Sequence, residues 1–157
     1  MTTKLTTCLW FDGVAEDAAR LYTSVFPRSR ILSVVRYGAG APGPEGSVMT
    51  VTFELDGREF TALNGGPVYT ISPAVSFVIH CRTQAEVDHY WERLTEGGRE
   101  VQCGWLTDRF GVSWQVVPVF LLEVLAGDDA AKAARVTAAM RKMIRLDLAA
   151  LEAAAAA

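Results

Sequence analysis

Long apolar runs, clusters of basic residues and patterned cysteines are all absent from this sequence of 157 residues. Its longest apolar stretches are far too short to span a bilayer, so we expect no membrane partner. No block of Lys or Arg dominates any region and the formal net charge is −3, so a nucleic-acid partner is not expected either. The first residues show no charged segment followed by an apolar one, and they therefore give no sign of a secretory signal.

Cysteine and histidine are scarce. The three cysteines are odd in number and have no framework spacing, which predicts free thiols in a reducing cytoplasm. Half of the residues are hydrophobic and 21% are charged, a balance typical of an ordinary globular protein. The length suits one domain, or two small halves that share a core.

The first half of the chain alternates strand-like and helical patterns. Asp56-Gly57 is a strong signal for a two-residue hairpin turn, and Pro27 stops the preceding helix. The patterns predict strands over 4–11, 30–37, 47–55 and 59–64, and a helix over 14–25.

The same order of elements returns in the second half. Thr83 and Glu86 form a capping box that begins a helix, which runs to about residue 94. Strands are predicted over 74–81, 99–103, 105–109 and 112–117. We therefore expect an α+β fold of duplicated βαβββ modules, at about 4–66 and 74–117, in one domain over 1–117. Pairing the two sheets would form a shared cleft.

Residues 118–157 change in character and form a helical extension. Apolar spacing predicts helices over 118–125 and 129–145, and a last helix from about Asp147 that ends in five alanines. Such helices do not stand alone, so they must pack on the sheets or on a second subunit. We therefore expect a homodimer.

Six segments together resemble the glyoxalase/bleomycin-resistance/extradiol-dioxygenase superfamily, also called vicinal oxygen chelate. The similarity is greatest to its PhnB-like branch, often labelled 3-demethylubiquinone-9 3-methyltransferase, and the tail over 142–148 is similar as well. The resemblance also implies a homodimer. The matching segments are Cys8–Gly13, Ala18–Tyr22, Phe60–Gly66, Ala74–Phe77, Cys103–Trp105 and Asp108–Gln115.

The resemblance also implies where a metal would be bound. Metal-dependent members place His or Glu ligands on four strands that face one cavity. Carried over by position, these ligands fall on Thr7, Ser76 and Gln115, with the fourth at Ala62 or Asn64. Hydroxyl and amide oxygens are weak neutral ligands, whereas a catalytic transition metal needs imidazole, carboxylate or thiolate. We therefore expect no tightly bound metal and no cofactor.

The segment Gly38–Gly43 matches the G-x-G-x-x-G pattern and follows a predicted strand. A nucleotide or methyl-donor site would need a helix to begin there, but Pro42, Pro44 and Gly46 lead into another strand. A hairpin loop is the favoured interpretation. The methyltransferase label of the branch therefore has no support from a methyl-donor motif in this sequence.

Reactive side chains are few. His80 has the same strand parity as Ser76 and could act as a general base, although a histidine at the end of a strand needs no catalytic role. Cys103 could be a nucleophile, but no activating histidine is evident. Cys8 is expected to face the helix layer as a buried thiol. Asp108 could anchor the turn at Phe110-Gly111.

The tryptophans divide by strand parity. Trp10 and Trp114 are expected to pack under the helices, whereas Trp105 is the best candidate for a cavity wall. Three functions stay open: a metal-free protein that binds a small, uncharged or weakly polar molecule, an enzyme that uses His80 or Cys103, and a structural dimer without a ligand. In the first case the residues that line the pocket are Thr7, Asn64, Ser76, Trp105 and Gln115.

Overall fold

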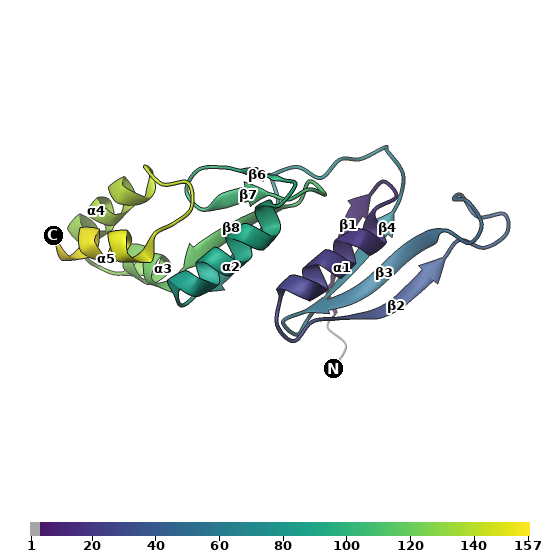
Figure 1. The fold of residues 1–157 in the computed structure, drawn as a ribbon, viewed down its shortest axis with the longest axis horizontal. Helices are drawn as coiled ribbons and strands as arrows, with labels where there is room; N and C mark the ends of the chain where they lie inside the picture. Colours follow the sequence, from purple (N-terminus) through teal and green to yellow (C-terminus); the bar gives the residue numbers. More distant parts are fainter. Residues whose placement is uncertain (1–3) are drawn as a thin grey trace. The chain divides into compact units, whose positions relative to one another are not determined.

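The structure, a computed structural model, describes residues 4–157. The chain divides into two compact units, one that ends at Ile71 and one that runs from Ser72 to Ala157. Figure 1 shows both units as a sheet with a helix across one face. None of the helices within residues 4–157 has the length and apolar character needed to cross a membrane.

The first unit is a four-stranded sheet in the order β1-β4-β3-β2. β1 pairs with β4 in parallel, and the other neighbours are antiparallel. The turn between β3 and β4 has positive φ at both central residues, Asp56 (48°) and Gly57 (80°), as a tight hairpin turn requires. The elements are β1 (Thr7–Phe11), α1 (Ala15–Val25), β2 (Arg30–Arg36), β3 (Val48–Leu55) and β4 (Arg58–Asn64).

The second unit repeats this topology, with a sheet in the order β5-β8-β7-β6 and one helix after its first strand. The Oγ of Thr83 accepts a hydrogen bond from the N–H of Glu86 at 3.2 Å, which confirms the predicted cap. The elements are β5 (Ser76–Cys81), α2 (Gln84–Thr95), β6 (Arg99–Glu100), β7 (Trp105–Thr107) and β8 (Ser113–Pro118). The α+β fold with duplicated modules is therefore confirmed.

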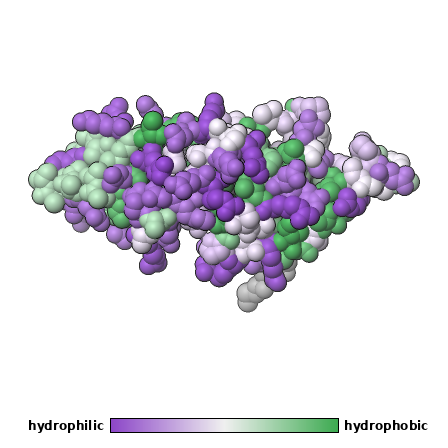
Figure 2. Space-filling view, in the orientation of Figure 1, coloured by the Kyte–Doolittle hydropathy of each residue, from purple (hydrophilic) through white to green (hydrophobic). Residues whose placement is uncertain are grey.

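Three helices complete the second unit: α3 (Val119–Ala126), α4 (Ala130–Met140) and α5 (Leu148–Ala156). They enclose a small core of their own, and its buried residues are Val117, Leu121, Val124, Val136, Leu146 and Leu151. The surface over these helices is pale green in Figure 2, as expected where alanines of the last helix are exposed. The predicted C-terminal helices are confirmed.

Some predicted boundaries are wrong for a physical reason. β6 ends at Glu100 rather than 103, because Cys103 (φ 60°) and Gly104 (φ 82°) form a tight turn. The helix predicted to reach 145 ends at Met140, because the chain must turn to bring Leu146 into the core. In both places a tertiary contact overrides the local pattern.

Candidate functional site

The second sheet has one face against α2 and one face turned away from it. Phe77, Ile79 and Cys81 alternate with Ser76, Val78 and His80 along β5, and Ile79 and Cys81 are buried. The register of β8 and β7 places the partners of these residues on matching faces. We call the face turned away from α2 the open face, and its residues are Ser76, Val78, His80, Trp105, Thr107, Ser113 and Gln115. Val117 has the same strand parity but is buried in the core of the C-terminal helices.

Three of the residues expected to line a pocket therefore lie together. The Nε2 of Gln115 donates a hydrogen bond to the Oγ of Ser76 at 2.9 Å. Trp105 lies directly opposite Gln115 across the β7–β8 pair and is half-buried. An aromatic side chain beside an amide gives one apolar and one hydrogen-bonding surface in the same place.

A row of hydroxyl groups crosses the open face. Ser113 is paired with Ser76 on one side and with Thr107 on the other, so the three side chains lie on neighbouring strands. Ser113 is 1% exposed, and its Oγ has no hydrogen-bond partner within residues 4–157. Buried hydroxyls are normally paired, so this atom has unused hydrogen-bonding capacity.

The remaining two predicted residues, Thr7 and Asn64, belong to the first unit. Thr7 has the strand parity of Leu9 and Phe11, both of which are buried on the side of α1. The expectation that Thr7 faces away from the helix layer is therefore wrong by one residue. Cys8, which we expected to be buried, is exposed.

The side chain of Asn64 connects β4 to the start of α1 and to β3 by hydrogen bonds. Its Oδ1 accepts a hydrogen bond from the N–H of Ala15 at 2.9 Å, and its Nδ2 donates one to the carbonyl of Val48 at 3.1 Å. The first bond caps α1, whose own N-cap residue, Val14, offers no side-chain acceptor. With its amide used in this way, Asn64 has a structural role that sequence reasoning missed.

Trp10 also differs from the prediction. It is half-buried on the face turned away from α1, with its ring against Tyr69 at a centroid distance of 5.0 Å. Its Nε1 donates a hydrogen bond to the carbonyl of Gly66 at 2.9 Å. Trp114, by contrast, is buried on the side of α2 as predicted, with Phe77 at 5.3 Å.

A cavity of about 530 Å³ lies in the first unit, where the loop after β2 meets the start of α1. The loop carries the glycine-rich segment and leads into β3, so no helix begins there. Three acidic residues are among those that line this cavity, and one of them, Glu16, is paired with Arg20 at 2.6 Å. The lining residues are Asp12, Gly13, Glu16, Asp17, Tyr37, Pro42, Gly43, Pro44, Ser47, Val48, Asn64, Gly65 and Gly66.

The candidate reactive residues lie apart from the centre of the open face. His80 is exposed near the end of β5, four residues from Ser76, a separation of roughly 13 Å along a strand. Cys103 is half-buried in the β6–β7 turn. Within residues 4–157 no three His, Cys, Asp or Glu side chains are grouped so that they could hold a metal ion.

Cys81 provides a test of the buried face. Burial, with a smaller effect of Glu86, raises the pKa of its thiol to about 12. At pH 8 we expect Cys81 to resist iodoacetamide in the folded protein and to react once urea unfolds it, while the exposed Cys8 reacts in both states. Peptide mass spectrometry checks this, and rapid alkylation of Cys81 in the folded protein would contradict it.

The same shift gives a pH dependence with a definite sign. An unfolded thiol deprotonates near pH 9, whereas folded Cys81 keeps its proton to about pH 12. The unfolded state therefore loses its proton first, and the contribution of this thiol to stability falls as the pH rises through this interval. Urea titrations between pH 8 and 10 should show the loss, and the Cys81→Ala variant should show less of it.

The repeated modules, each with a helix on one side of its sheet, form a fold that this chain shares with several solved structures. A family model described as 3-demethylubiquinone-9 3-methyltransferase matches residues 3–117. The chain belongs to this family. A comparison with curated proteins gives no match.

Solved structures agree with this assignment. A PhnB protein from Bacillus cereus, described as a 3-demethylubiquinone-9 3-methyltransferase, is 38% identical over 74% of this chain and 99% of its own, with a TM-score of 0.69. PA1353 from Pseudomonas aeruginosa shares the fold at 21% identity, with coverages of 74% and 98% and a TM-score of 0.62. The fosfomycin resistance protein FosX from Mesorhizobium loti also shares it, at 13% identity, coverages of 73% and 89%, and a TM-score of 0.51.

Proposed function

We propose that this protein binds a small, weakly polar organic molecule on the open face of its second sheet. The observation that carries the proposal is the position of Trp105 directly opposite Gln115, whose amide is hydrogen-bonded to Ser76. Val78 adds apolar surface, since its side chain is 44% exposed. A flat apolar wall next to a few neutral donors and acceptors suits an aromatic ligand that carries a hydroxyl or amide group.

The chemistry of this face argues against a bound metal. Its polar groups are hydroxyls and an amide, with His80 as the single imidazole among the residues of the open face. A transition metal needs several imidazole, carboxylate or thiolate ligands around one point, and these residues do not fit that requirement. The proposal therefore includes no metal and no cofactor.

Thr7 and Asn64 are left out of the proposed site. The parity of Thr7 places it on the side of α1, and the amide of Asn64 is occupied by Ala15 and Val48. His80 is roughly 13 Å from Ser76 along the strand, so a ligand held by Ser76 and Gln115 does not need it. Nothing in this geometry favours proton transfer over binding.

A homodimer and a cytoplasmic location remain our predictions. The apolar side chains of Leu32, Val34 and Val35 on β2 support a partner surface, because they are exposed at the edge of the first sheet. A second copy of the chain is the partner that we expect to cover them.

Binding can be tested with a panel of small neutral phenols and benzamides. We expect saturation-transfer NMR to detect at least one binder, and the backbone amides of 105 and 113–116 to shift on titration. The Trp105→Ala variant should bind at least tenfold more weakly, since it loses the aromatic wall. The Ser76→Ala variant should lose a smaller factor of about five to ten, the value of one neutral hydrogen bond.

A matched control removes a hydroxyl elsewhere. Ser24 is exposed on α1, and its Oγ donates to the carbonyl of Leu21, so Ser24→Ala should leave binding unchanged. Shifts confined to the cavity of the first unit, around Tyr37 and Gly43, would contradict the proposal. The absence of any binder in the panel would contradict it as well.

A further inference from the structure

The segment that joins α4 to α5 is hydrogen-bonded to the turn that precedes Trp105. We call residues 143–148 the latch. The N–H of Cys103 donates to the carbonyl of Met143 at 2.9 Å, and the N–H of Gly104 donates to the carbonyl of Ile144 at 2.8 Å. These bonds connect positions about forty residues apart in the sequence, so they tie the C-terminal helices to the β6–β7 turn.

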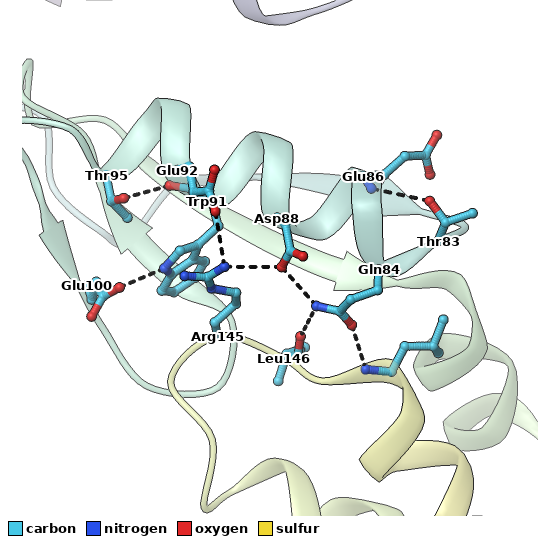
Figure 3. Close-up of polar contacts among 11 residues, drawn as sticks. Thr83, Gln84, Glu86, Asp88, Trp91, Glu92, Thr95, Glu100, Arg145 and Leu146 are labelled. Carbon is cyan, nitrogen blue, oxygen red and sulfur yellow. Dashed lines mark hydrogen bonds and ion pairs between the residues drawn. The ribbon is translucent and has the colours of Figure 1, made fainter.

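Gln84 attaches the latch to α2. Its Nε2 donates to the carbonyl of Leu146 at 3.1 Å, and its Oε1 accepts from the N–H of Leu148 at 2.8 Å (Figure 3). One side chain therefore holds a donor and an acceptor of the latch backbone. Leu146 itself is fully buried in the C-terminal core.

Charged contacts assist this attachment. Arg145 approaches Asp88 at 3.1 Å and Glu92 at 3.5 Å, as Figure 3 shows. The hydrogen bond from Gln84, followed by that from Arg145, holds the pKa of Asp88 below its usual value. These ion pairs are solvent-exposed and contribute little by themselves, so the bonds of Gln84 are the main connection.

The turn held by the latch has an unfavourable backbone. Cys103 (φ 60°) and Gly104 (φ 82°) both have positive φ, and the N–H of Trp105 donates to the carbonyl of Gln102 at 3.2 Å. Such a turn favours Asn or Gly at its first central position, whereas a cysteine there persists where its surroundings impose it. The two latch carbonyls that accept hydrogen bonds from Cys103 and Gly104 hold the backbone of the turn in this conformation.

We infer that Gln84, acting through the latch, is a positioning residue that sets the place of Trp105 on the open face. Trp105 follows the turn directly and lies opposite Gln115, so a change in the turn moves the aromatic wall. The expected effect of Gln84 on ligand binding rests on the proposed function. The geometry of the turn can be tested without any ligand.

The test replaces Gln84 with methionine in the full chain. Methionine keeps the length and helix propensity of glutamine but makes neither hydrogen bond. We expect amide exchange at Cys103 and Gly104 to rise at least tenfold and the Trp105 indole signal to shift in ¹H–¹⁵N spectra. Any phenol that binds the wild type should bind three- to tenfold more weakly.

The control is Glu86→Met on the same helix. The carboxylate of Glu86 accepts from the N–H of Arg82 at 2.5 Å and has no bond to the latch. This variant weakens the start of α2, but it should leave the amides of Cys103 and Gly104 and the Trp105 signal unchanged. Equal effects from both variants would overturn the inference, since the cause would then be a general loosening of α2.

A rescue variant separates positioning from stability. Cys103→Asn places asparagine before Gly104, the pair that favours this turn without outside support. In the Gln84→Met background it should restore the Trp105 signal and any phenol binding. If exchange rises in Gln84→Met while the Trp105 signal stays in place, positioning is wrong although the proposed function can stand. If no phenol binds the wild type, the proposed function fails while the spectra still decide the inference.

Discussion

The Asp108→Ala variant is expected to lose about 4 kcal/mol of unfolding free energy, because a buried carboxylate with several hydrogen bonds is removed. Asp108 is 3% exposed. Its Oδ1 accepts from the N–H groups of Phe110 at 2.8 Å and Val112 at 3.0 Å, and its Oδ2 accepts from the Nε1 of Trp114 at 2.9 Å. Alanine would remove the acceptor of all three of these hydrogen bonds.

Urea unfolding at neutral pH measures this loss. Asp108→Asn retains one acceptor oxygen and should lose roughly half as much, since its amide cannot serve both the turn and the indole. Asp128→Ala provides the control, because this aspartate is exposed between α3 and α4. A midpoint for Asp108→Ala within error of the control would show that the turn does not depend on this carboxylate.

The same variant should affect the open face. The turn over 108–112 comes directly before β8, whose residues Ser113 and Gln115 lie on the open face. Without Asp108 the register between β7 and β8 loses its anchor at the turn. We therefore expect the amide signals of 113–116 to broaden in Asp108→Ala even below the unfolding midpoint.

Local signals in the sequence determined much of the fold. The Asp56-Gly57 turn and the capping box at Thr83 fixed the hairpin and α2, because both are formed by neighbouring residues. Asp108 anchors its turn as the sequence indicated. The family resemblance implied that Ser76 and Gln115 face one cavity, and the two side chains are hydrogen-bonded to each other.

Strand parity failed where the sequence offered two similar choices. Residues 5–11 read Leu-Thr-Thr-Cys-Leu-Trp-Phe, and Cys8 and Trp10 are as apolar as Leu9 and Phe11. A shift of one residue exchanges the two faces of a strand, so Thr7 and Cys8 were both assigned to the wrong side. Leu9 and Phe11 are buried under α1, and this packing determines which face of β1 lies toward the helix.

The latch could not be predicted for a different reason. The hydrogen bond between Met143 in the latch and Cys103 in the turn joins residues that are distant in the sequence, and backbone hydrogen bonds carry no signature in side-chain identity. Asn64 likewise looked like a pocket residue, since nothing nearby shows that α1 lacks a capping side chain of its own. Backbone hydrogen bonds between distant segments, and a helix cap supplied by a distant residue, can therefore be found only in the structure.

The Gly104→Ala variant is expected to lose about 3 kcal/mol of stability, because a Cβ there has no room. It would lie 2.9 Å from both the Cδ1 of Leu146 and the carbonyl oxygen of Val116. The positive φ of 82° adds a conformational cost of about 1 kcal/mol for any residue with a side chain. Thermal and urea unfolding measure the sum of the two effects.

Gly111 separates strain from steric conflict. It has a similar φ of 89°, but a Cβ would meet nothing within 4 Å, so Gly111→Ala should lose about 1 kcal/mol only. The excess loss at Gly104 then reports the steric conflict with Leu146 and with the carbonyl oxygen of Val116. In a Leu146→Ala background that excess should shrink by about 1 kcal/mol, as coupled neighbours do. Equal losses at Gly104 and Gly111 would mean that neither Leu146 nor the carbonyl of Val116 limits the space at position 104.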